Sequence, residues 1–153
     1  MIYLASDHAG YALKEAAKKF LEENNFECED AGPFSYDKDD DYSDYIIPAA
    51  KKVAAHPGNM GIIFGGSGQG EAMAANKVAG IRAAVFYGGP DDMIILSREH
   101  NDANVLSLGA RFLTQEDAVK AIDLWLRTSF PREERHVRRI LKIHAFEDIS
   151  MSL

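Results

Sequence analysis

Short apolar runs alternate with amphipathic segments along the whole chain, and this alternation is the feature that most constrains the fold. Five runs predict strands, at 1–5, 26–32, 60–66, 81–87 and 103–110. The segments between and after them predict helices, at 11–25, 45–56, 71–77, 90–102, 114–129 and from about Pro131 to about His144. Strand–helix alternation of this kind indicates an α/β fold, with a parallel sheet covered by helices on both faces.

Length and composition predict one ordinary globular domain over residues 1–153, in which 142–153 form a helix end and a polar tail. The chain is 46% hydrophobic and 27% charged, which is typical of such domains. Its net charge of −7 argues against a nucleic-acid partner, because nucleic acid requires a basic face.

Several absences complete the class assignment. No apolar run approaches the roughly 20 residues that span a bilayer, and the N-terminal segment lacks the features of a secretory signal. The lone Cys28 excludes an internal disulfide and a multi-cysteine metal cluster. We therefore expect a cytoplasmic protein without a membrane partner.

The stretch "GGSGQGEAMAANKVAG", Gly65 to Gly80, joins a buried strand to a helix. Such a turn leaves backbone N–H groups free at the helix start, where they attract anionic oxygens. The pattern is neither a P-loop nor a dinucleotide fingerprint. Glu71 is either a reactive carboxylate or a partner of the helix dipole, and Ser67 is either an anion ligand or a cap.

Other polar residues flank the predicted strands, and most are expected to gather in loops at one end of the sheet. Asp7 and His8 follow the first strand, and Arg111 follows the fifth. His100 and Asn101 come just before the fifth strand. Each has a plainer interpretation: Asp7 and His8 as a helix cap, His100 as a partner of a helix C-terminus.

Two charged clusters also have alternative interpretations. Arg135 and Arg139 are four residues apart, so they either grip a phosphate together or belong to a solvated helix face. The run "DKDDDYSD", Asp37 to Asp44, is either a metal-binding loop or a solvated linker. Because clustered carboxylates in a linker are usually solvated, we interpret this run as solvated.

Taken together, four motifs identify a family. "SDHAGYALK", "GGSGQGEAMAANKVAGIRAA", "SREHNDANVLSLGAR" and "ERHVRRI" resemble the type B ribose-5-phosphate isomerases and the related galactose-6-phosphate and allose-6-phosphate isomerases, in order from Ile2 to about Ile143. The resemblance implies a three-layer αβα sandwich around a Rossmann-like five-stranded parallel sheet. It also implies a metal-free, cofactor-free homodimer or homotetramer whose sites are shared between subunits.

The resemblance carries roles to matching residues of this chain. His100 would open the sugar ring. The substrate, a small sugar phosphate, would be bound by Asp7, His8, Gly66, Ser67, Gly68, Gln69, Gly70, Asn101, Arg111, Arg135 and Arg139. Within this set the glycine loop would cradle the reacting end of the sugar, and the three arginines would hold the phosphate.

The chain departs from the better-known branch at Gly65, where many members carry a cysteine base. Cys28 lies on another predicted strand and does not match that position. A mycobacterial-type branch reads G-G-S-G-x-G-E, as here, so Glu71 becomes the base and Ser67 its neighbour at the anion site. Ser43 replaces a common proline, and we expect no consequence.

We therefore predict an aldose–ketose isomerase of carbohydrate metabolism that interconverts ribose 5-phosphate and ribulose 5-phosphate, a step of the pentose phosphate pathway, through an enediolate. The alternatives are a six-carbon sugar-phosphate isomerase, a non-catalytic sugar-phosphate sensor and a flavodoxin-like nucleotide module, which fits the fold alone. The sequence leaves open dimer or tetramer, which subunit supplies each residue, the direction of the Glu71 pKa shift, and the roles of His136 and the tail.

Overall fold

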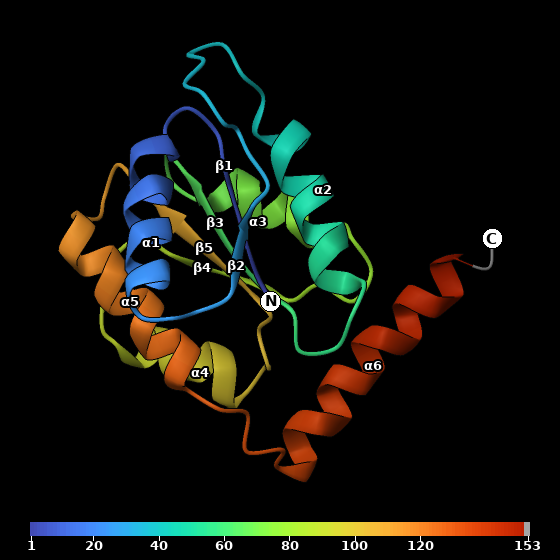
Figure 1. Ribbon diagram of the computed structural model, residues 1–153. Coiled ribbons are helices and arrows are strands. Elements are labelled where there is room, and N and C mark those ends of the chain that lie inside the picture. The colour runs from blue at the N-terminus through green and yellow to red at the C-terminus, as the bar shows by residue number, and fades with distance from the viewer. Residues whose placement is uncertain (152–153) are drawn as a thin grey trace.

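A computed structural model describes residues 1–151, with side chains described as far as residue 147. Its centre is a five-stranded sheet in the order β2-β1-β3-β5-β4, in which every pair of neighbours is parallel (Figure 1). The strands are β1 Ile2–Ser6, β2 Cys28–Asp30, β3 Met60–Gly65, β4 Ala83–Phe86 and β5 Val105–Gly109. The predicted five-stranded parallel sheet is confirmed.

Helices cover both faces of this sheet, as predicted. On one face lie α1 (Tyr11–Glu23), α4 (Asp92–Glu99) and α5 (Gln115–Arg127), and on the other lie α2 (Tyr42–Ala54) and α3 (Gln69–Ala75). Thr114 caps α5 as predicted, because its hydroxyl accepts a hydrogen bond from the Asp117 N–H at 3.1 Å. The result is the expected αβα sandwich.

Two apolar cores, one on each face, hold the layers together. Successive strand residues point to opposite faces, so Ile62 belongs to one core and Ile63 to the other. The larger core packs Leu106 and Leu108 of β5 against Trp125 of α5. This double burial explains why the strands are continuously apolar rather than alternating.

The last helix, α6 (Glu134–Met151), corrects one prediction. It does not end near His144 but continues to Met151, so residues 145–151 are helix rather than tail, while 152–153 lie outside the described residues. No glycine or proline interrupts 134–151, and the Glu147 carboxylate accepts a hydrogen bond from the Gly80 N–H at 3.0 Å. That contact ties the extended helix to the body.

In Figure 1, α6 lies beyond the amino end of the sheet and covers neither of its faces, while His144 and Glu147 contact Arg82 and Gly80 of the body. Its large apolar side chains Leu141, Ile143 and Phe146 are exposed. A helix with such a face typically packs against another surface. None of the helices within residues 1–151 is long and apolar enough to cross a bilayer.

We predict that Leu106→Ala lowers the free energy of unfolding by about 2–5 kcal/mol, because the side chain is fully buried in the central core. Leu96→Ala on the exposed side of α4 is the matched control, with an expected change of at most about 0.5 kcal/mol. Urea unfolding at one protein concentration measures both. Equal costs would contradict the assignment of the core.

Candidate active site

Three loops meet where β1, β3 and β5 end, which we call the carboxyl end of the sheet. These strands are neighbours, so the segments that follow them are adjacent. Backbone hydrogen bonds join them: the Asp7 N–H donates to Phe64 O at 3.3 Å, and the Arg111 N–H donates to Gly66 O at 3.0 Å. Asp7, His8, the glycine loop and Arg111 are thereby brought together, as predicted from the sequence.

The glycine loop is close-packed at two of its glycines. Gly68 has a left-handed φ of 75°, and a Cβ there would lie 3.0 Å from the Leu108 backbone. A Cβ on Gly66 would lie 3.0 Å from the Arg111 guanidinium. The absence of side chains therefore lets Arg111 lie directly against the loop that precedes α3.

Glu71 stands in the first turn of α3 and is only 4% exposed. Burial raises its pKa above the ordinary value, and the nearby Asp7 carboxylate raises it further. Its backbone hydrogen bond and Arg111 act in the opposite direction but do not outweigh burial. The pKa of Glu71, whose direction of shift the sequence left open, is therefore raised. A raised pKa suits a carboxylate that must accept a proton near neutral pH.

The Glu71 carboxylate occupies the space beside Gly65. A Cβ built at Gly65 would overlap both carboxylate oxygens of Glu71. Position 65 is where many members of the resembled family carry a cysteine. The buried position of the Glu71 carboxylate therefore requires glycine at position 65, because a larger residue there would displace the carboxylate.

Ser67 and Asp7 also have structural roles. The Ser67 hydroxyl accepts a hydrogen bond from the Gln69 N–H at 3.3 Å, and Asp7 Oδ1 accepts one from the Gly10 N–H at 3.0 Å. Both side chains thus stabilise the turns that lead into α3 and α1. These roles leave the Ser67 O–H proton and Asp7 Oδ2 for other partners.

The sequence interpretation missed two residues at this end. Tyr42 lies against the glycine loop, since a Cβ on Gly70 would be 2.9 Å from its ring. Asp40 accepts a 2.7 Å hydrogen bond from His8 Nδ1. Asp40 belongs to the acidic run interpreted as solvated, yet its side chain is only 3% exposed. Nothing in the local pattern separates it from its exposed neighbours.

His100 and Asn101 correct a second prediction, because they lie at the amino end of the sheet. They follow α4 and precede β5, whereas Arg111 follows β5. In a parallel sheet these positions are at opposite ends, and β5 alone separates them by roughly 15 Å at about 3.3 Å per residue. The predicted site residues therefore form two half-sites in this chain.

The amino-end half-site is completed by α6. The rings of His100 and His136 stack with centroids 4.2 Å apart and planes inclined by 15°. His136 is buried, and neither of its ring nitrogens makes a hydrogen bond with a described residue, although Nε2 lies 3.8 Å from the Glu133 carboxylate. Burial lowers the pKa of His136. Arg135 and Arg139, on either side of it, are exposed.

The Asn101–Asp102 turn is held by Arg82. The Arg82 Nε donates to Asn101 O at 2.9 Å, and Nη2 donates to Asp102 O at 2.8 Å. Arg82 Nη1 also lies 3.1 Å from His144 Nε2 on α6. The turn that carries His100 and the helix that carries His136 are thus fastened to the same side chain.

Comparisons with known proteins show the family. The model of the Ribose/Galactose Isomerase family matches residues 2–143. Ribose-5-phosphate isomerase B of Mycobacterium leprae is 41% identical over 146 residues, which cover 95% of this chain and 89% of that protein. The chain belongs to the ribose/galactose isomerase family.

Two further relatives extend the likeness. The probable ribose-5-phosphate isomerase B of Mycoplasma pneumoniae is 42% identical, with 95% of this chain and 94% of that protein covered. The crystal structure of ribose-5-phosphate isomerase B from Mycoplasma genitalium with bound ribulose-5-phosphate superposes with a TM-score of 0.91 at 39% identity, covering 96% of this chain and 95% of that one. The predicted family and its fold are confirmed.

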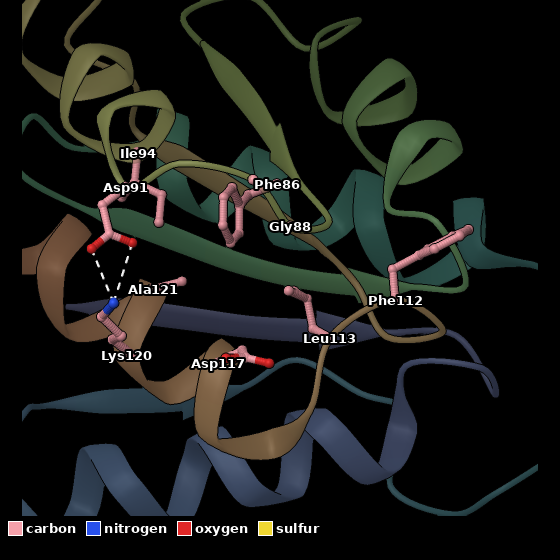
Figure 2. Close-up of a pocket in the computed structure, with 10 residues that line it drawn as sticks. Phe86, Gly88, Asp91, Ile94, Phe112, Leu113, Asp117, Lys120 and Ala121 are labelled. Carbon is pink, nitrogen blue, oxygen red and sulfur yellow. Dashed lines mark hydrogen bonds and ion pairs between the residues drawn. The ribbon is translucent and has the colours of Figure 1, made fainter.

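A separate cavity of about 250 Å³ lies beside β4 and α5, and Figure 2 shows its lining. Its charged residues are Asp91, Asp117 and Lys120, and Asp91 pairs with Lys120 at 3.0 Å. None of the predicted site residues lines it. Two carboxylates beside one already paired lysine do not favour an anionic sugar phosphate, so we place the candidate site at the glycine loop.

Asp7, His8 and Asp40 have ligand atoms within 4.8 Å of one another, which is the spacing of a possible metal site. However, His8 and Asp40 are hydrogen-bonded to each other, and Asp7 Oδ1 accepts from a backbone N–H. Part of the cluster is therefore already engaged in hydrogen bonds within the protein, while Asp40 Oδ2 is buried without a hydrogen-bond partner among the described residues. We describe the cluster as a hydrogen-bonded group at the carboxyl end of the sheet.

The raised pKa of Glu71 predicts a stability effect. A carboxyl group that is easier to protonate when folded destabilises the fold once pH exceeds its unfolded pKa, near the ordinary 4.5. Glu71→Gln should therefore raise the free energy of unfolding at pH 8, and this gain should vanish as pH falls below about 4.5.

Urea unfolding at pH 8 and pH 4 tests this expectation. Glu116→Gln is the matched control, because Glu116 is exposed in the first turn of α5. A Glu71→Gln variant that is less stable than the parent at pH 8, or a gain that persists at pH 4, would contradict the raised pKa.

Proposed function

We propose that this chain is a ribose-5-phosphate isomerase in which Glu71 is the base, His100 opens the sugar ring and the arginines hold the phosphate. The observation that carries the proposal is the Glu71 carboxylate, buried against Gly65 beside an anion-binding loop. The relatives from Mycobacterium leprae and Mycoplasma pneumoniae, named as a ribose-5-phosphate isomerase B and a probable one, support the choice of substrate.

The reaction moves one hydrogen between C2 and C1 of the open sugar. Glu71 takes the C2 proton, the electron pair forms a C1–C2 double bond, and negative charge moves onto the C1 oxygen. The resulting enediolate then receives the proton at C1, and the proton of the C2 hydroxyl passes to the C1 oxygen as the ketone forms at C2. A base with a raised pKa suits both transfers, since it must accept and return the same proton.

The enediolate oxygens require donors that are already in place. The glycine loop offers backbone N–H groups, and the Ser67 hydroxyl, which accepts from the Gln69 N–H, still has a proton to donate. Fixed donors of this kind are worth about 3–4 kcal/mol each in the transition state. Glycines at these positions allow the substrate to approach the backbone closely.

Glu71 and His100 belong to opposite ends of the sheet, so a complete site requires a second copy of the chain. In the proposed homodimer, the carboxyl end of one copy faces the amino end of the other. The exposed apolar residues of α6 and the exposed Arg135 and Arg139 support such an arrangement. The phosphate would then lie between Arg111 of one copy and the two arginines of the other.

His100 is the proposed proton shuttle for ring opening, since imidazole titrates near neutral pH. Its ring is stacked on His136, whose lowered pKa keeps that neighbour neutral. A neutral stacking partner fixes the His100 ring without adding a second positive charge. Asn101, exposed beside His100, is placed to bind a sugar hydroxyl in the same half-site.

The proposal predicts turnover of ribose 5-phosphate to ribulose 5-phosphate in the presence of EDTA. Glu71→Gln should lower kcat by about 10²–10⁴-fold, because it removes the base while preserving the shape of the side chain. Glu116→Gln should leave kcat unchanged. A coupled assay of ribulose 5-phosphate, with circular dichroism to confirm folding, measures all three proteins.

Other outcomes of this assay decide between functions. Turnover of allose 6-phosphate or galactose 6-phosphate without turnover of ribose 5-phosphate would replace the pentose with a six-carbon substrate. Tight binding of sugar phosphates with no turnover of any would indicate a sensor. A Glu71→Gln variant as active as the parent would refute Glu71 as the base.

A further inference from the structure

One carboxylate of the acidic run behaves unlike its neighbours. The Asp40 side chain is 3% exposed, whereas the Asp39 side chain is 75% exposed and pairs with Lys38. The two residues are adjacent and chemically identical. The fold has therefore selected Asp40 for burial, which corrects the interpretation of the whole run as solvated.

Asp40 holds His8 at two points through a single oxygen. Its Oδ1 accepts hydrogen bonds from the His8 backbone N–H at 3.0 Å and from His8 Nδ1 at 2.7 Å. Together these contacts fix both the backbone and the ring of His8. Tyr36 completes the setting, with its ring edge-on to the imidazole at 6.4 Å between centroids.

The contact also decides which histidine nitrogen remains for a substrate. A carboxylate at Nδ1 keeps the proton on that nitrogen, so Nε2 is the atom left to act. Nε2 makes no hydrogen bond with any residue that the structure describes, and the His8 side chain is 28% exposed. His8 is therefore held by its inner nitrogen and accessible by its outer one.

The two carboxylates around His8 raise its pKa. The hydrogen bond from Asp40 raises the pKa of His8, and the charge of Asp7 adds to this, while burial and Arg111 lower it by less. These are the charged groups that face the ring. The net effect is a pKa of His8 above its ordinary value, at the end of the sheet where Glu71 lies.

One oxygen of Asp40 has no structural use. Oδ2 is buried and has no hydrogen-bond partner among the described residues. A carboxylate placed only to anchor a loop would gain from having both oxygens paired, since an unpaired buried acceptor is costly. The arrangement instead favours His8 at the expense of stability, which is common around functional groups.

We propose that Asp40 is a positioning residue for sugar-phosphate isomerisation, which orients His8 and fixes its Nδ1–H tautomer so that Nε2 faces the substrate. This inference rests on the proposed function for its catalytic consequence. The part of the inference that concerns the tautomer and the pKa of His8 does not depend on any substrate. The two parts can therefore fail separately.

Asp40→Asn is the decisive variant, because asparagine keeps an oxygen for the His8 N–H but removes the charge. We expect the His8 ring to titrate at lower pH than in the parent and kcat/KM to fall by about 10- to 100-fold. Asp39→Asn removes the same charge from an exposed neighbour and should change neither the titration of His8 nor kcat/KM. Long-range ¹H–¹⁵N NMR of the imidazoles, recorded without substrate, gives tautomer and pKa.

Several results would overturn the proposal. An Nε2–H tautomer of His8 in the parent protein would do so even if Asp40→Asn fails to fold. Unchanged His8 titration in a folded Asp40→Asn variant, or equal effects from Asp39→Asn, would do so as well. Parent activity that is lost in EDTA and restored by Mn²⁺ would mean that a metal holds these side chains instead. Correct NMR behaviour without any isomerase activity would reject the proposed function and leave the His8–Asp40 pairing intact.

Discussion

The polarity of the parallel sheet determines everything else about the site. Every strand points the same way, so loops that follow strands and loops that precede them cannot meet within one chain. Glu71 and Arg111 lie at one end and His100 at the other. The catalyst that we propose needs both sets and would therefore be assembled from two copies, with α6, which covers neither face of the sheet, contributing surface to their contact (Figure 1).

In the carboxyl-end half-site, two carboxylates are buried at a cost to the stability of the fold. Glu71 is buried with a raised pKa, and Asp40 is buried with one oxygen unpaired. Neither arrangement stabilises the folded state, because burying a charged or unpaired polar group costs free energy. Both make sense where a proton must be exchanged near neutral pH, because burial and pairing tune the groups that hold it.

Sequence periodicity was sufficient for the sheet, its helices and the capping by Thr114, since these follow from local pattern. It also brought Asp7, the glycine loop and Arg111 to one end through a general rule for parallel sheets. It failed for His100, because a residue that precedes a parallel strand lies at the end of the sheet opposite to the residues that follow strands. It failed for Asp40 because burial of one aspartate among several depends on a contact with His8, 32 residues away.

The central claim, that each site combines Glu71 of one copy with His100 of another, is tested most directly by subunit mixing. Glu71→Gln and His100→Asn chains, each inactive alone, are co-expressed so that mixed dimers form. Each mixed dimer regains one intact site, so we predict about a quarter of parental activity from random pairing. Activity no greater than the sum of the separate variants would contradict a shared site.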